Sequence, residues 1–233
     1  MHSTHPGEAH STSVSSKLNT LRAGVLGAND GIVSTSALLL GVIAAGAGAT
    51  ETFTAGMAAA VAGAVSMALG EYVSVSAQRD SEKSLIAKES GELRDMPTEE
   101  TSEMEEILRG FGVSEKTAAT AAAEIHAGDP LHAHLQLELG IDAEDLTSPW
   151  SAAASSALSF ILGALLPLVS VLLAPHSSAA AVVTLVTLVS LGGTGLVSAR
   201  LSDTRTRRSV ARLIIGGAIG LALTYGIGSL FPV

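Results

Sequence analysis

Glutamates recur at helical spacing in the middle of the sequence. Glu89 and Glu92 are three residues apart, as are Glu100 and Glu103, and Glu106 follows at the same interval. Residues three apart share one face of an α-helix, so each pair presents two carboxylates that repel one another unless a cation lies near them. The spacing therefore indicates binding of divalent metal ions. The alternative is an acidic, solvated helix face, which is the commonest explanation of a run of charge.

Two further carboxylates interrupt long apolar stretches, Asp30 in LGANDGIVST and Glu71 in SMALGEYVSV. A carboxylate inside a membrane span costs about 2.5–3.5 kcal/mol on insertion scales, so it tends to face a cavity or an ion pathway. Met67 precedes Glu71 by one helical turn, and a thioether beside carboxylates suits a borderline ion such as Fe²⁺ or Mn²⁺. We interpret these residues as candidates for an ion pathway. The alternatives are helix capping at the headgroup boundary and simple core packing of Met67.

The remaining candidate ligands are histidines, because the sequence contains no cysteine and therefore no thiolate or disulfide. His126, His132 and His134 gather near the end of the acidic region. A second group, in the N-terminal tail, has irregular spacing: His2, His5, Glu8 and His10. The sequence has no phosphate-binding loop, nucleophile elbow or dinucleotide fingerprint, so nothing indicates an enzyme or ATP-driven transport.

The elements that must position these side chains are helices, five of which are expected to cross a bilayer. Apolar residues make up 47% of the 233 residues and charged residues only 15%, and the mean hydropathy is +0.44. A helical span needs roughly 17–25 predominantly apolar residues. Five stretches without Asp, Glu, Lys or Arg have this length: Ile32 to Thr50, Thr52 to Gly70, Ser151 to Ala174, Ser177 to Ala199 and Leu213 to Val233. We therefore expect an all-α membrane protein with five transmembrane helices.

Basic residues set the expected orientation of these spans. All 13 Lys and Arg residues lie in the N-terminal flank, in residues 79–148 or in the loop after the fourth span. The connections around Thr50–Glu51 and Pro175–His176 contain none. Since Lys and Arg mark the cytoplasmic side, we expect the N-terminus and the acidic region inside and the C-terminus outside. The net charge of −9 argues against a nucleic-acid partner.

Changes in composition divide the chain into four segments: a polar tail (1–20), transmembrane helices 1–2 (21–78), an acidic cytoplasmic helical domain (79–148) and transmembrane helices 3–5 (149–233). The third segment has 17 acidic and 6 basic side chains. Its helices are predicted to begin at Thr98, Ser114 and Asp129–Pro130. Small residues recur in the spans, as in GVIAAGAGA and IIGGAIGLAL, which predicts closely packed helices.

Three motifs resemble those of one known family. They are LGANDGIVST in the first span, GAVSMALGEYVSVSAQRDSEK at the end of the second, and LELG at residues 137–140. With the five spans and the acidic insert between the second and third, these motifs make the chain similar to the vacuolar iron transporter family from about Leu21 to the C-terminus. That family includes yeast vacuolar importers of iron and manganese and many bacterial members.

The resemblance implies a homodimeric secondary transporter without a prosthetic group, which moves Fe²⁺, and often Mn²⁺, out of the cytosol in exchange for protons. It implies positions on the ion pathway for Asp30 and Met67. Glu71 lies beside them, although many members have Gly at the position of Glu71. It also implies metal binding by glutamates of the cytoplasmic domain. The matching residues are Glu89, Glu92, Glu100, Glu103 and Glu138.

The chain departs from the family's pattern just before Glu138. Better-known members have a Met and sometimes another carboxylate there, whereas this chain reads His134, Leu135, Gln136, so His134 would substitute as a ligand. The leading hypothesis is a proton-coupled Fe²⁺/Mn²⁺ exporter in the cell membrane, or in the vacuolar membrane of a eukaryote. Its partners would be lipid, divalent ions, protons and a second copy. A membrane-anchored metal sensor or scaffold without transport, and a passive cation channel, are the alternatives.

Overall fold

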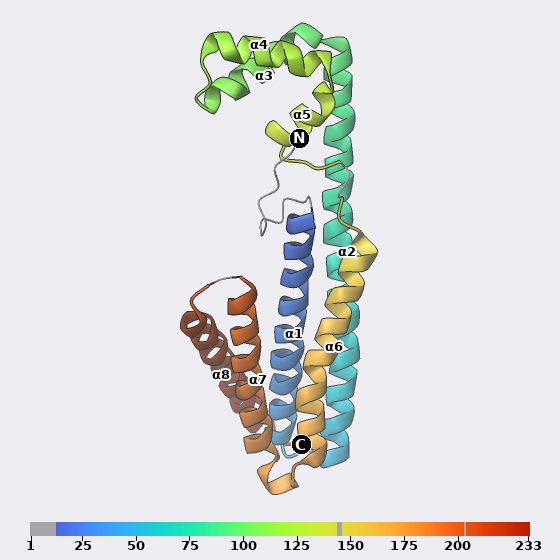
Figure 1. Ribbon diagram of the computed structural model, residues 1–233. Coiled ribbons are helices and arrows are strands. Elements are labelled where there is room, and N and C mark those ends of the chain that lie inside the picture. The colour runs from blue at the N-terminus through green and yellow to red at the C-terminus, as the bar shows by residue number, and fades with distance from the viewer. Residues whose placement is uncertain (1–12, 144–145, 203) are drawn as a thin grey trace. The chain divides into compact units, whose positions relative to one another are not determined.

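The computed structural model describes residues 13–143, 146–202 and 204–233, and the predicted ligands of the N-terminal tail (His2, His5, Glu8 and His10) lie outside this range. Within it the chain is helical and contains no strand. The helices are α1 Ser13–Ala44, α2 Ala49–Asp95, α3 Pro97–Gly110, α4 Glu115–Ala127, α5 Pro130–Leu137, α6 Pro149–Leu173, the short 3₁₀ helix η1 His176–Ser178, α7 Ala179–Leu201 and α8 Thr206–Leu230 (Figure 1).

Five of these segments are long and apolar enough to cross a membrane. They are Ala23–Ala44, Ala49–Asp95, Pro149–Leu173, His176–Leu201 and Thr206–Leu230. The prediction of an all-α membrane protein with five spanning helices is thereby confirmed.

The first span begins earlier than the uncharged stretch predicts. It covers Ala23–Ala44 rather than Ile32 to Thr50, and the latter prediction was wrong. Helix α1 stops at Ala44, and Gly46 follows with a φ of 91°, a left-handed conformation that favours glycine and suits the end of a helix. The helix continues through Asp30, so this carboxylate lies inside the first span.

The chain forms two compact units. The larger contains Lys17–Val73 and Pro149–Val233, and the smaller contains Ser74–Ser148. Helix α2 contributes its first part to the larger unit and its last part to the smaller one. The larger unit therefore holds the apolar parts of all five spanning helices, and the smaller unit holds α3, α4 and α5.

In the larger unit, α1 lies beside α6 (Figure 1), and glycines lie where the two helices meet. A Cβ atom on Gly31 of α1 would overlap with the carbonyl oxygen of Phe160 in α6. A Cβ atom on Gly163 of α6 would likewise overlap with the carbonyl oxygen of Ala28 in α1. The two backbones thus approach as closely as the small residues in the sequence predict.

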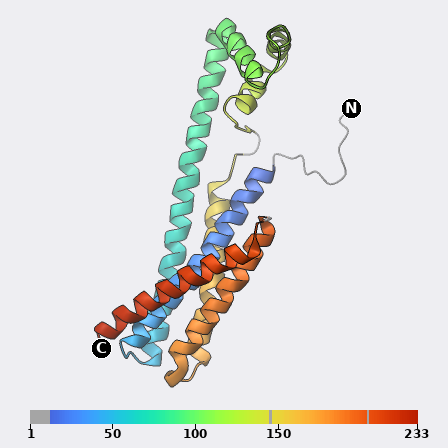
Figure 2. The ribbon, with the colours of Figure 1, turned by 90° about the vertical axis from the view of Figure 1, so that its left-hand side faces the viewer.

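Helix α1 also contacts α7 and α8. The hydroxyl groups of Thr187 in α7 and Ser36 in α1 lie 2.7 Å apart, and both side chains are buried. Leu39 and Leu40 of α1 pack in an apolar cluster with Val183 of α7 and Leu221 of α8. Helices α7 and α8 lie side by side in both views (Figure 2). These contacts make α1 a central helix of the larger unit.

In the smaller unit, α3 and α4 pack against each other, and α5 follows them. Helix α3 begins at Pro97, so Thr98 is its second residue and not its cap, because proline suits the first helical position, where no N–H donor is needed. Ser114 precedes α4 as predicted. Asp129 caps α5, and its side chain accepts a hydrogen bond of 3.1 Å from the backbone N–H of His132.

Candidate metal centre

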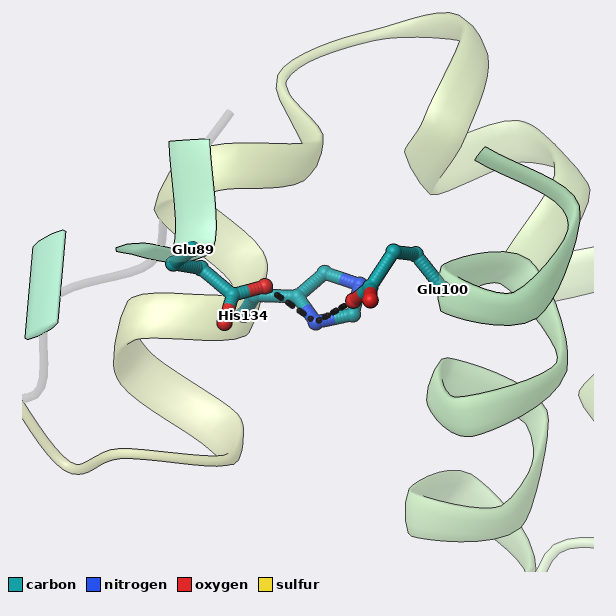
Figure 3. A group of neighbouring side chains, drawn as sticks. All are labelled: Glu89, Glu100 and His134. Atoms are coloured by element: carbon teal, nitrogen blue, oxygen red, sulfur yellow. Dashed lines mark ion pairs between the residues drawn. The ribbon is translucent and has the colours of Figure 1, made fainter. Parts of the chain in front are cut away.

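Three side chains that bind metals well converge in the smaller unit. Glu89 comes from α2, Glu100 from the first turn of α3, and His134 from α5. One ligand atom of each lies within 4.8 Å of the others. Figure 3 shows the two carboxylates pointing toward the imidazole from opposite sides. The three side chains are buried, with exposed fractions of 3% for Glu89, 5% for Glu100 and 0% for His134.

The ring nitrogen Nδ1 of His134 lies at the centre of the group. It is 3.1 Å from Oε1 of Glu89 and 3.7 Å from Oε2 of Glu100. Oε2 of Glu138, one turn further along the chain, lies 3.1 Å from the same nitrogen, within hydrogen-bonding distance. Because residues four apart share a helical face, α5 and the residue that follows it present His134 and Glu138 together.

The carboxylates of this site are held in an unfavourable electrostatic environment. Burial, followed by the negative charge of Glu138, raises the pKa of Glu89 from 4.5 to about 7, against the opposing effect of His134. Burial also raises the pKa of Glu103, and the negative charge of Glu138 has the next largest raising effect. A divalent cation among these groups would offset both the repulsion and the loss of hydration.

Several buried polar atoms of the site lack a hydrogen-bond partner within the described part of the chain. They are Nε2 of His134 and two carboxylate oxygens that approach Nδ1 of His134 without a hydrogen bond, Oε1 of Glu89 and Oε2 of Glu100. Buried polar groups are almost always paired, so each such atom requires an explanation, such as an ion or an ordered water molecule. Carboxylate oxygen together with imidazole nitrogen suits divalent transition metals such as Fe²⁺, Mn²⁺, Co²⁺ and Zn²⁺. The donor set therefore fits an ion of this class.

The other predicted glutamates lie around this group or away from it. Glu92 is partly buried and pairs with Lys88 at 2.9 Å. Glu103 is exposed, yet its pKa responds to Glu138 and Glu100, which places it at the edge of the site. Glu106 is exposed on α3 and does not belong to the buried group. The sequence spacing alone did not separate these positions.

The predicted pathway residues lie in the larger unit, on α1 and α2. Asp30 is exposed in a single copy of the chain, and Glu71 is partly buried. Met67 packs against an apolar cluster that contains Phe160 and Ala164 of α6. Within the described residues, Asp30 and Glu71 do not belong to any group of three or more Asp, Glu or His ligands.

Helix α4 contributes His126, one of the three histidines that lie close together in the sequence near the end of the acidic region. The ring centre of His126 lies 5.4 Å from that of His134, with the ring planes at 88°. The signal in the sequence was the grouping of His126, His132 and His134, but spacing across two helices does not reveal which two side chains meet. In the structure His134 is buried and His132 is exposed.

Comparison with known proteins shows similarity over nearly the whole chain. The sequence model of the VIT family matches residues 21–229. A vacuolar iron transporter of Acanthamoeba castellanii is 36% identical over 225 residues, which cover 96% of this chain and 83% of that protein. Vacuolar iron transporter homolog 1 of Oryza sativa subsp. japonica is 33% identical over 227 residues, covering 97% and 80%. Vacuolar iron transporter homolog 1 of Arabidopsis thaliana is 35% identical over 218 residues, covering 93% and 85%.

Proposed function

The chain belongs to the VIT family, and from this we infer that it is a membrane transporter of divalent transition metal ions and not an enzyme. Iron is the expected ion, because the similar proteins are named iron transporters. The observation that carries the proposal is the buried group of Glu89, Glu100 and His134 in a chain with five helices able to span a membrane. Manganese is a second expected ion, because carboxylate oxygens suit Mn²⁺.

We assign the smaller unit the capture of the ion from the cytosol. Three carboxylates lie around one imidazole there, from Glu89, Glu100 and Glu138. The arrangement of Lys and Arg in the sequence supports a cytoplasmic location for this unit, with the C-terminus on the opposite side of the membrane. The direction of transport would then be out of the cytosol, across the cell membrane or into a vacuole.

The proposed pathway across the membrane contains Asp30, Met67 and Glu71. Carboxylates suit exchange of metal for protons, because a metal binds their deprotonated form and displaces protons when it binds. An opposing proton gradient can therefore drive release of the ion. We propose proton-coupled antiport on this basis.

The exposure of Asp30 supports a homodimer. Asp30 lies inside the first span and is exposed in a single copy of the chain. A carboxylate facing lipid costs about 2.5–3.5 kcal/mol on insertion scales. A second copy that covers this face of α1 would remove the carboxylate from lipid and place it beside a pathway between the two copies.

Transport of Fe²⁺ and protons by purified protein in liposomes tests this function. Fe²⁺ is supplied inside or outside the liposomes, and dyes report the metal concentration and the pH. The wild-type protein should move metal and protons in opposite directions. Asp30→Ala should abolish the metal-dependent proton flux. Asp80→Asn, at an exposed position of α2, is the control and should leave it unchanged. Wild-type rates in Asp30→Ala would remove Asp30 from the pathway.

The same experiment separates the two alternatives. A membrane-anchored sensor or scaffold would bind metal through Glu89, Glu100 and His134 but would move neither metal nor protons. A passive channel would move metal without an opposing proton flux. Metal flux without coupled protons would therefore replace antiport with a channel, and tight binding without flux would replace transport with sensing.

A further inference from the structure

The orientation of His126 leaves one of its ring nitrogens free. Its Nδ1 lies 3.0 Å from the carbonyl oxygen of Ala122, one turn earlier in α4. A carbonyl oxygen only accepts hydrogen bonds, so Nδ1 carries the proton and Nε2 of the neutral ring carries a lone pair. This Nε2 atom is buried and has no hydrogen-bond partner within the described residues.

His134 has the same arrangement. Its Nδ1 bonds to the carboxylate of Glu138 at 3.1 Å, and its Nε2 is buried without a hydrogen-bond partner in the described part of the chain. An ionised carboxylate can accept hydrogen bonds but cannot donate them. The proton therefore lies on Nδ1 and the lone pair on Nε2. Histidines that bind metals characteristically donate the other ring N–H to a carboxylate or a backbone carbonyl, and the two rings use one partner of each kind.

The distance between the rings suits one shared ion. The ring centres of His126 and His134 are 5.4 Å apart. Two imidazoles that bind one ion tetrahedrally, each through a nitrogen at about 2.0–2.1 Å, have their ring centres roughly 5 Å apart. Two neighbouring rings thus each have a buried, unpaired nitrogen and lie at the separation that a bridging ion requires.

We propose that His126 and His134 bind one divalent transition metal ion through their Nε2 atoms, while Nδ1 of His134 donates its proton to Glu138. The inference rests on the proposed function and deepens it, since it adds α4 to the site and narrows the class of ion. Imidazole nitrogen suits Fe²⁺, Co²⁺, Ni²⁺ and Zn²⁺, whereas Mg²⁺ and Ca²⁺ prefer oxygen ligands alone. The pair of imidazoles therefore discriminates against the Mg²⁺ and Ca²⁺ that carboxylates alone would admit.

The competing explanation is packing of two rings edge to face, without an ion. Aromatic rings commonly meet in this way, and the angle of 88° between the planes is compatible with it. In that case His126 would affect folding but not metal affinity. His132 provides a matched control, because it lies on the same helix as His134 and is exposed.

The test uses full-length protein in detergent with Co²⁺ as the probe. X-ray absorption of the wild-type protein with one equivalent of Co²⁺ should show two imidazole ligands per ion, and one or none would overturn the proposal. His126→Gln should lower the Co²⁺ affinity at least about tenfold and remove one imidazole from the spectrum. Mn²⁺ affinity should fall less, since Mn²⁺ depends less on nitrogen ligands. His132→Gln should bind Co²⁺ as the wild type does.

Two further readouts keep the result interpretable. The melting temperature of metal-free His126→Gln reports whether the variant folds. The X-ray absorption spectrum of the wild-type protein counts the imidazole ligands without the use of any variant. Unchanged Co²⁺ affinity in folded His126→Gln would contradict the proposal even if iron is transported. Conversely, two imidazoles per ion in a protein that moves no metal would uphold the site and refute the transport function.

Discussion

Nδ1 of His134 lies 3.1 Å from Oε1 of Glu89, and both side chains are buried. The contact joins α5 to the end of α2, the helix whose apolar part belongs to the larger unit. Glu100 of α3 approaches the same nitrogen at 3.7 Å, so the group draws residues from three helices. Its properties therefore depend on how these helices pack.

Metal binding is expected to weaken in acid because of Glu89. Its pKa is raised to about 7, whereas metal requires the ionised carboxylate. Affinity for Mn²⁺ or Co²⁺ should therefore fall by up to about tenfold for each pH unit below 7, as one proton competes with the ion. Calorimetric titration at pH values on both sides of 7 measures this. Glu89→Gln should bind more weakly but show a shallower pH dependence, while exposed Glu106→Gln should behave as the wild type does.

The same raised pKa has the opposite effect on the stability of the metal-free protein. Between pH 4.5 and about 7, folded Glu89 holds a proton that the unfolded chain has released. The free energy of unfolding therefore decreases as pH rises through this window. Thermal melting without metal should show this decrease in the wild-type protein and a smaller one in Glu89→Gln. An equal decrease in both would assign the effect to other groups.

Close packing of α1 on α6 should make Gly31 intolerant of a side chain. In Gly31→Ala the new Cβ would overlap with the carbonyl oxygen of Phe160, and separating the backbones should lower stability by roughly 1–3 kcal/mol. Gly193→Ala in α7 is the control, because a Cβ there meets no atom within 4 Å. Alanine should stabilise that helix by up to about 1 kcal/mol. Melting temperatures in detergent distinguish the two, and equal values would contradict the packing.

The contact between Thr187 and Ser36 is expected to stabilise the bundle modestly. Ser36 donates to the carbonyl of Ile32 in its own helix, so the one hydroxyl proton of Thr187 is shared between Ser36 Oγ at 2.7 Å and the carbonyl oxygen of Val183 at 2.6 Å. Thr187→Val keeps the shape and removes this hydrogen bond, at a cost of about 0.6 kcal/mol and at most about 1.7 kcal/mol. Thr184→Val, which removes only a bond to Ala180 within α7, should cost less. Unfolding in detergent with added denaturant provides the comparison.

If a second copy covers Asp30, residues one turn away on α1 should lie near the interface. Leu26 is such a residue, and it is 56% exposed in a single copy. The chain has no cysteine, so Leu26→Cys creates a single thiol that should form disulfide-linked dimers in membranes. Leu162 on α6 has the same exposed fraction of 56%, so Leu162→Cys serves as the control. Equal cross-linking of both would indicate random collision.

The sequence by itself determined the helical class, the five spans and the acidic insert between the second and third. These features depend on local properties, namely the length of apolar runs, the absence of charge within them and the residues that begin helices. Ser114 and Asp129 illustrate this, because each precedes the helix that it was predicted to begin. The first span shows the limit, since the uncharged stretch begins only at Ile32 although α1 extends through Asp30.

Only the tertiary structure decided which of the equally spaced glutamates meet. Helical periodicity places Glu100, Glu103 and Glu106 on related faces of one helix, but it does not say which face meets α2 and α5. The packing buries Glu100 with Glu89 and His134 and leaves Glu106 exposed. Contacts between distant segments depend on the turns and on side-chain fit, and these are absent from any local pattern.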